Sequence, residues 1–136
     1  MIVREIYEKI INELEKSIAD ELLNGSDFSE LAATVHDYVN KLGTRILEQI
    51  VEDADKAFKD SSERKRHWQI VRKDTRSVLT AMGEVKISRN YYRHKVTGEY
   101  AHLADEVLKL PAYDRVEEGL KADLILKASG MSYSRA

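Results

Sequence analysis

An apolar repeat with the spacing of an α-helix runs through the first 57 residues and limits the folds open to this chain. Apolar side chains recur every three or four residues across residues 2–23, and the acidic side chains lie outside that stripe. A second stripe runs from Phe28 to Ala57. Between the stripes, residues 24–27 (Asn-Gly-Ser-Asp) supply turn and capping chemistry, and Glu30 completes a capping box. The pattern predicts an antiparallel hairpin of two long helices over residues 1–62.

This helical hairpin is expected to be incompletely buried. Gly43 interrupts the second stripe and weakens that helix by roughly 1 kcal/mol relative to alanine. Two helices cover only one side of each other, so apolar surface is left for a third element or for a second copy of the chain. We therefore expect a homodimer.

The residues from 63 to 112 change character and favour strands. β-branched and aromatic side chains become frequent from Trp68 onward, and Gly83 separates two such runs as a hairpin turn would. Thr97-Gly98 offers a second turn, after which residues 100–103 form a candidate third strand. The sequence thus predicts a small antiparallel β-meander over residues 63–112.

Residues 113–136 again have a helical pattern. An apolar stripe runs over residues 116–128, Gly130 fits a C-terminal cap, and Ser132 fits the N-cap of a further helix. This spacing is that of a helix-turn-helix cut off after one turn, although a plain helical hairpin has the same pattern. The expected fold class is α+β and mostly α, in a natural protein that continues beyond Ala136.

Charge is divided unevenly along the chain. The net charge is −2, yet residues 1–63 carry 7 basic against 15 acidic residues, and residues 64–95 carry 10 basic against 2 acidic. Such a division is expected when one segment meets a polyanion. In the alternative, the basic and acidic blocks pack against each other. For Trp68 and Tyr91 individually we expect core positions, because large aromatic side chains dominate small cores. The candidate DNA contacts are Arg64, Lys65, Arg66, Arg72, Lys73, Arg76, Lys86, Arg89, Arg93 and Lys95, with Ser132, Tyr133 and Arg135 from the truncated helix.

Catalytic and metal-binding patterns are not recognisable in this sequence. Cysteine is absent, which excludes disulfides and thiolate zinc sites and is compatible with a cytoplasmic protein. His94 and His102 flank the second turn but have no cysteine partners for a zinc site. There is no phosphate-binding glycine loop and no nucleophile elbow. The sequence also lacks an apolar run long enough to span a membrane. We expect this segment alone not to be an enzyme and to need no cofactor.

Several short motifs resemble bacterial insertion-sequence transposases of the ISLre type, a family also catalogued as an uncharacterised protein family. A threonine precedes a Gly-Glu-Val turn in residues 80–85, and Arg-Asn-Tyr-Tyr follows at residues 89–92. Residues 103–110 and the closing residues 131–136 add to the resemblance. Related transposases often have zinc-binding cysteines after such a strand, whereas this chain continues Arg93-His94-Lys95. A zinc ribbon is therefore excluded.

The resemblance implies a longer protein with an Asp-Asp-Glu nuclease domain beyond residue 136, which would use divalent metal ions such as Mg²⁺. The present segment would bind transposon-end DNA and assemble transposase subunits. Two alternatives stay open: a dimerisation scaffold without DNA contact, and a small intact DNA-binding regulator.

Overall fold

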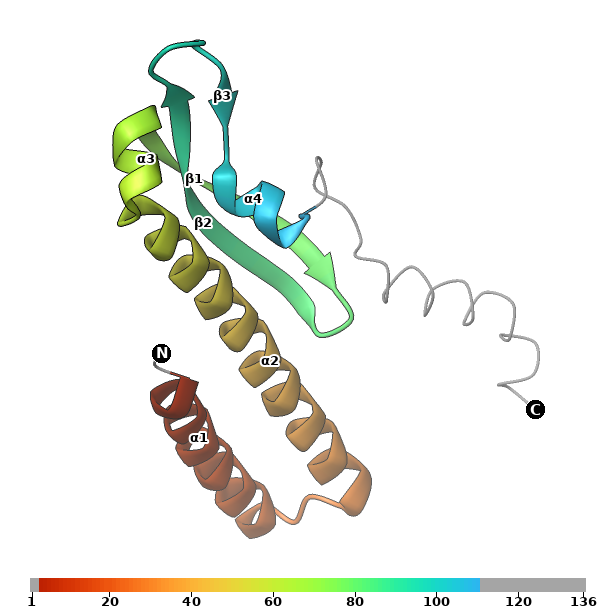
Figure 1. Ribbon diagram of the computed structural model, residues 1–136. Coiled ribbons are helices and arrows are strands. Elements are labelled where there is room, and N and C mark those ends of the chain that lie inside the picture. Colours follow the sequence, from red (N-terminus) through yellow and green to blue (C-terminus); the bar gives the residue numbers. More distant parts are fainter. Residues whose placement is uncertain (1–2, 111–136) are drawn as a thin grey trace, which may run out of the picture.

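The computed structural model describes residues 3–110, which form an α+β fold that is mostly helical (Figure 1). Helix α1 (Val3–Leu23) and helix α2 (Phe28–Lys59) form the predicted antiparallel hairpin. Asp27 is the N-cap of α2, and its Oδ1 accepts a hydrogen bond from the Glu30 backbone N–H at 2.9 Å. The predicted cap and the length of α2 are thus confirmed. The helix and turn predicted for residues 113–136 lie outside the described residues.

The contact between α1 and α2 is narrow. Ile10 is the buried residue of α1, and polar contacts add to the contact, such as the 2.9 Å Ser17–Tyr38 hydroxyl pair. Phe28 begins the predicted apolar stripe of α2, but its side chain is 85% exposed. The prediction that Phe28 packs with the stripe is wrong, because at the first position of α2 it extends beyond the surface that α1 covers.

A three-stranded antiparallel sheet follows, in the order β1-β2-β3. Strand β1 (Trp68–Thr80) pairs with β2 (Gly83–His94) from Thr80↔Gly83 to Trp68↔His94, with an irregularity between Ile70 and Arg72. Gly83 has φ +125°, so the turn uses the conformation that glycine tolerates best. Strand β3 is only Tyr100–Ala101. The predicted meander is confirmed.

Two short helices were not expected from the sequence. Helix α3 (Ser62–His67) lies within the segment predicted as meander, and helix α4 (Leu103–Leu108) replaces the end of the predicted third strand. The Ser61 hydroxyl accepts from the Arg64 backbone N–H at 3.2 Å and so caps α3. Six residues are too few to show a helical period, and such helices depend on caps and tertiary packing.

The main apolar core lies where the β1–β2 hairpin packs against α2. Val51 of α2 packs with Val78 of β1 and with Val85 and Ile87 of β2, all at most 6% exposed. The side chains of Leu108 and Leu110 pack against this cluster after α4 crosses the sheet. The hairpin is therefore held between α2 and α4, which fixes the position of its basic side chains.

Candidate nucleic-acid interface

The β1–β2 hairpin has one face on which α4 lies, and an opposite face that is open toward the turn but covered by α2 at Asn90 and Tyr92, which are buried. Register pairs Arg76 with Ile87, Asp74 with Arg89 and Arg72 with Tyr91. Because alternate residues of a strand point the same way, these side chains share the face on which α4 lies (Figure 1). The open face carries small and basic side chains, among them Lys73, Thr75, Ser77, Lys86 and Ser88.

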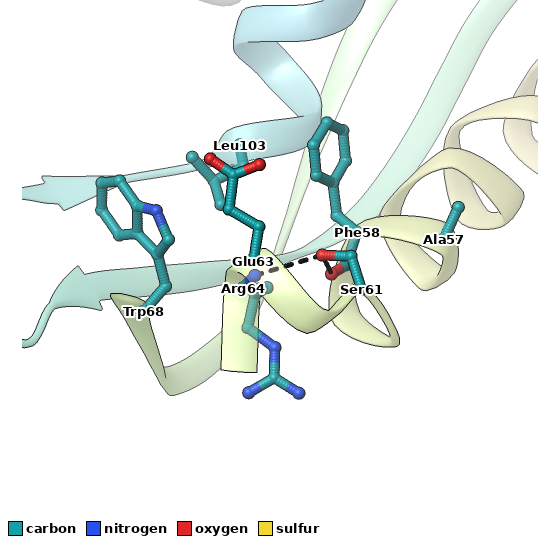
Figure 2. Close-up of a pocket in the computed structure, with 7 residues that line it drawn as sticks. All are labelled: Ala57, Phe58, Ser61, Glu63, Arg64, Trp68 and Leu103. Atoms are coloured by element: carbon teal, nitrogen blue, oxygen red, sulfur yellow. Dashed lines mark hydrogen bonds between the residues drawn. The ribbon is translucent and has the colours of Figure 1, made fainter. Parts of the chain in front are cut away.

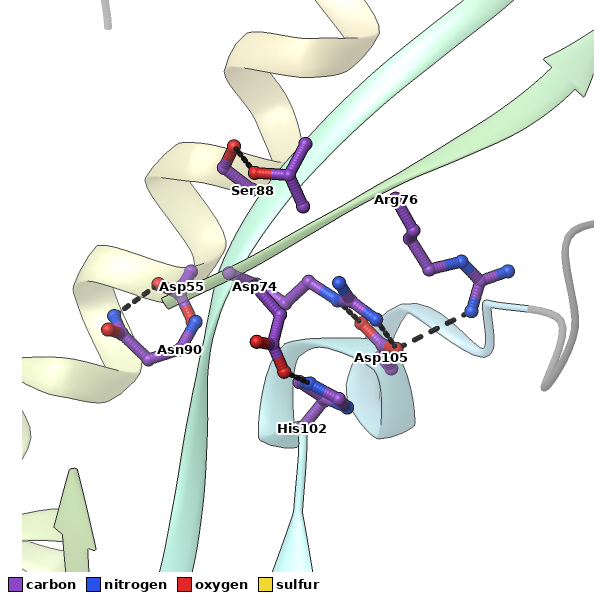
Figure 3. Close-up of polar contacts among 9 residues, drawn as sticks. Asp55, Asp74, Arg76, Ser88, Asn90, His102 and Asp105 are labelled. Atoms are coloured by element: carbon purple, nitrogen blue, oxygen red, sulfur yellow. Dashed lines mark hydrogen bonds and ion pairs between the residues drawn. The ribbon is translucent and has the colours of Figure 1, made fainter. Parts of the chain in front are cut away.

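Arg76 and Arg89, both predicted DNA contacts, are held by α4 instead. The Arg89 guanidinium makes a bidentate contact with Asp105, with Nε–Oδ1 at 2.8 Å and Nη2–Oδ2 at 3.1 Å. Arg76 Nη1 lies 3.7 Å from the same carboxylate (Figure 3). Arg89 is only 4% exposed. This pairing is what a buried arginine needs, since an unpaired buried charge is strongly unfavourable. The two arginines thus stabilise the packing of α4 on the sheet.

A second cluster of polar side chains on this face consists of Asp74, His102 and Arg72. His102 Nε2 lies 2.7 Å from Asp74 Oδ2 (Figure 3). Arg72 Nε donates to Asp74 Oδ1 at 2.8 Å. The hydrogen bond from His102, and then that from Arg72, lowers the pKa of the Asp74 carboxyl below its ordinary value. His102, considered above as a metal ligand, therefore has a carboxylate partner within the fold.

Tyr91 is part of a partly exposed stack of flat side chains rather than of the core. The Arg72 guanidinium lies 4.5 Å from the centre of the Tyr91 ring. The rings of Tyr91 and Tyr100 stack at 5.3 Å with a 13° interplanar angle. The fully buried tyrosine is instead its neighbour Tyr92, at 0% exposed. The prediction that Tyr91 is a core residue is wrong, because Tyr92 points to the opposite side of the strand, where α2 packs.

Exposed cations gather where α3 meets the end of β2. We name Lys65, Arg66 and Lys95 the hairpin-base cluster; all three residues are exposed. Lys95 Nζ donates to the Lys65 carbonyl at 2.6 Å, and the Lys95 backbone N–H donates to the His67 carbonyl at 2.8 Å. These bonds join two segments thirty residues apart. Sequence reasoning named these cations, but only the fold brings them together.

The aromatic side chains next to this cluster also come from both segments. The rings of His67 and His94 stack at 6.0 Å, and Trp68 meets His94 edge-on at 4.9 Å. His94 Nδ1 accepts from the backbone N–H groups of Val96 and Thr97, each at 3.2 Å. His94 and His102 thus have different partners, and the structure does not join them.

The other predicted DNA contacts are spread more widely. Lys73 and Lys86 are exposed on the open face of the hairpin, and Arg93 is half-buried. Arg64 is half-buried, and its Nε donates to the Lys59 carbonyl at 2.7 Å. Ser132, Tyr133 and Arg135 lie outside the described residues. The exposed predicted cations therefore lie on α3, on the β1–β2 hairpin and just after β2: Lys65, Arg66, Arg72, Lys73, Lys86 and Lys95.

Helix α2 covers the outer edge of β2 with two carboxylates, a feature that sequence reasoning missed. Glu48 Oε2 accepts from the Lys86 backbone N–H at 2.8 Å. Asp55, which lies beside Asn90 in Figure 3, accepts through Oδ1 from the Asn90 backbone N–H at 3.0 Å. Asp55 Oδ2 also accepts from the Asn90 side chain at 2.6 Å. Covering an edge in this way prevents pairing with other strands. The sequence contains one signal for this contact: Asp55 lies one helical turn after Val51, on the buried side of α2.

The described part of the chain shows no metal site and no membrane span. Within residues 3–110, no group of three or more His, Cys, Asp or Glu side chains is arranged to hold a metal ion. In the same residues, no helix has the length and the apolar content needed to cross a bilayer.

Comparison with known proteins places this arrangement in a family. The sequence profile of an uncharacterised protein family, UPF0236, matches residues 21–136. The chain belongs to UPF0236. A UPF0236 protein of Caldanaerobacter subterraneus subsp. tengcongensis, TTE1650/TTE2708, is 32% identical over the whole chain. A second from this organism, TTE2489, is 34% identical over 91% of the chain. No solved structure matches the chain.

The UPF0236 relatives are much longer proteins. The chain spans 29% of the length of TTE1650/TTE2708 and 27% of that of TTE2489. The family match begins near the end of α1 and includes α2, the hairpin and α4. The hairpin and its cations therefore belong to the family region.

Proposed function

We propose that this region of a UPF0236 protein binds DNA, as the N-terminal part of an insertion-sequence transposase of the ISLre type that engages the transposon ends. The observation that carries the proposal is the hairpin-base cluster: Lys65, Arg66 and Lys95 are all exposed, and Lys95 Nζ donates to the Lys65 carbonyl. Cations in such an arrangement neutralise phosphates and release condensed counterions. The exposed Lys73 on β1 extends the positive surface along the hairpin.

The pairing of charges within the fold supports DNA contact over a pure scaffold. A scaffold would use the basic side chains to hold the acidic helices. In residues 3–110, however, none of the exposed cations Lys65, Arg66 and Lys73 forms an ion pair with a carboxylate of α1 or α2. The basic side chains that do pair with carboxylates in β1 and α4 are Arg72, Arg76 and Arg89. Lys65 and Arg66 thus keep their charge available for a polyanion, whereas Lys73 lines a pocket together with Glu52 and Asp55 of α2.

The names of the relatives support a mobile genetic element. One UPF0236 relative that is 31% identical to this chain combines eleven gene designations of one organism in its name, and another combines four. An element that inserts copies of itself leaves several copies of its gene in one genome. Together with the motifs shared with ISLre-type transposases, this multiplicity favours transposition as the activity of the whole protein.

In this proposal the chemistry belongs to the rest of the protein. An Asp-Asp-Glu nuclease domain and its Mg²⁺ ions would lie beyond residue 136, and no residue of the present chain carries that role. The present region would position the DNA end and pair two copies of the transposase through the helical hairpin.

A salt series with matched charge variants tests DNA binding. We expect a duplex of the transposon end to bind with an affinity that falls steeply with salt concentration, and more tightly than a random duplex. Lys65→Gln/Arg66→Gln should lower the slope of log affinity against log salt by about 2, one for each lost phosphate contact. Lys9→Gln/Lys16→Gln changes the same charge at exposed positions of α1 and should leave the slope unaltered.

Two results would contradict DNA binding by the hairpin-base cluster. Absence of binding to either duplex at low salt would favour the scaffold alternative. Equal losses in the two double variants would show that only the net charge matters and that α3 does not form the interface.

A further inference from the structure

A pocket of about 290 Å³ opens where α2 ends and α3 begins (Figure 2). Phe58 of α2, Trp68 of β1 and Leu103 of α4 provide its apolar walls, and Glu63 and Arg64 of α3 also line it. Lys65 and Arg66 directly follow these two residues in the chain. The short helix α3 therefore contributes both to the pocket wall and to the cations proposed above to contact phosphates.

The pocket combines flat apolar walls with one acceptor group. Figure 2 shows the Glu63 carboxylate reaching into the space between Trp68 and Phe58, whereas the Arg64 guanidinium points away from it. Within residues 3–110, the Glu63 carboxylate has no hydrogen bond or ion pair. An ionised carboxylate only accepts hydrogen bonds, so its occupant must offer N–H or O–H groups.

Aromatic walls accept either a cationic side chain or a flat uncharged ring. The positive charges on α3 favour one of these two ligands over the other. A cationic side chain would suit the aromatic walls and Glu63, but it would approach Lys65 and Arg66 against like charge. A nucleotide instead carries a phosphate for those cations and an uncharged aromatic base for the walls. Base stacking on aromatic side chains is the usual way in which proteins hold an unpaired base.

We propose that this pocket receives an unpaired nucleobase next to the DNA duplex, guanine in preference to thymine. The inference rests on the DNA binding proposed above. Guanine presents two adjacent N–H groups on its pairing edge, which match the two oxygens of the Glu63 carboxylate. Thymine offers one N–H between two carbonyl oxygens, and these oxygens would face the carboxylate. The pocket would thus recognise an end or a distorted site, where a base has left the stack.

The only tryptophan of the chain, Trp68, reports directly on this pocket. We would titrate the whole chain with a duplex that is blunt, or that ends in a single unpaired dG or dT, and follow Trp68 emission. Stacking of a base on the indole should quench the emission with the dG extension and much less with the blunt duplex. The dG duplex should bind roughly tenfold more tightly than the dT duplex, the discrimination expected of a bidentate contact.

Two variants and one control separate the parts of the pocket. Glu63→Gln should remove most of the preference for dG, and Phe58→Leu should weaken binding of the extension while it retains the Trp68 signal. Glu99→Gln removes one carboxylate at an exposed position in the turn between β2 and β3, so it should change neither the preference nor the quenching.

The outcomes keep this inference distinct from DNA binding itself. Salt-dependent binding of all three duplexes, with equal affinity and unchanged Trp68 emission, would overturn the pocket and leave the proposed function in place. Failure of every duplex to bind would overturn the proposed function. A dG preference that survives Glu63→Gln would show that another site reads the base.

Discussion

Tyr92 brings a hydroxyl group into the interior with little compensation. The residue is 0% exposed, and its hydroxyl makes no hydrogen bond of regular geometry within residues 3–110; the Asn90 side chain is a polar neighbour and partly offsets the rise in pKa that burial causes. Burial, and then the nearby negative charge of Asp55, raises the pKa of Tyr92 to about 12. The neutral phenol is therefore the form that the fold accepts.

Replacing Tyr92 with phenylalanine should stabilise the protein. An unsatisfied buried polar group costs about 1–3 kcal/mol, so Tyr92→Phe should raise the free energy of unfolding by about 1 kcal/mol at pH 8. Because the folded pKa of Tyr92 lies above the unfolded value of about 10, its contribution is intact below pH 10 and is lost as pH rises toward 12. The advantage of the variant should therefore grow between pH 10 and pH 12.

Urea unfolding at pH 8 and pH 11 measures both effects, and Tyr7→Phe, at a half-exposed position of α1, is the control. Loss of stability in Tyr92→Phe at pH 8 would mean that the hydroxyl has a partner that stabilises the fold.

At the scale of elements, the close approach of α2 to the hairpin turn explains a glycine in the middle of a long helix. A Cβ atom at Gly43 would overlap the Met82 side chain of the turn between β1 and β2. From the sequence, Gly43 was only a weak point of the helix. In the fold it is the position at which the tip of the hairpin contacts α2.

Alanine at Gly43 should therefore fail to give the usual benefit. In a helix interior Gly→Ala stabilises by about 1 kcal/mol, but here Met82 must move, and we expect Gly43→Ala to be neutral or destabilising. In a Met82→Ala background the same change should stabilise by about 1 kcal/mol. Thermal unfolding of the four proteins gives the coupling between the two sites. Stabilisation by Gly43→Ala of the wild-type protein would show that Met82 yields without cost.

The elements also show what the sequence can reveal about this fold. The extent of α2 and the turn at Gly83 were predictable, because a long period and a glycine between strand runs are local signals. The roles of the basic side chains were not. Arg89 and Lys95 are both cations of the basic segment 64–95, and the sequence does not distinguish their roles. In the fold, Arg89 is buried against Asp105 whereas Lys95 is exposed. That difference arises from the position of α4, which no local pattern indicates.

At the scale of the whole molecule, the helical hairpin extends away from the sheet (Figure 1). The turn between α1 and α2 lies at the end far from α3, and it exposes large apolar side chains. Leu22, Leu23 and Phe28 are 60%, 86% and 85% exposed. Apolar side chains gathered at one end of a helical hairpin are suited to burial against a second copy.

We expect this end of the hairpin to mediate dimerisation of the chain. Sedimentation velocity over a concentration series should show a monomer–dimer equilibrium, and Leu23→Glu/Phe28→Glu should shift it to monomer, because burying these charges is unfavourable. The far-ultraviolet circular dichroism should stay the same, since both side chains are exposed in the monomer. Val96→Glu, at an equally exposed position in the turn after β2, should leave the equilibrium unaltered. A chain that sediments as a monomer at every concentration would assign subunit pairing to other parts of the UPF0236 protein, and DNA binding by the hairpin-base cluster would then not require a dimer.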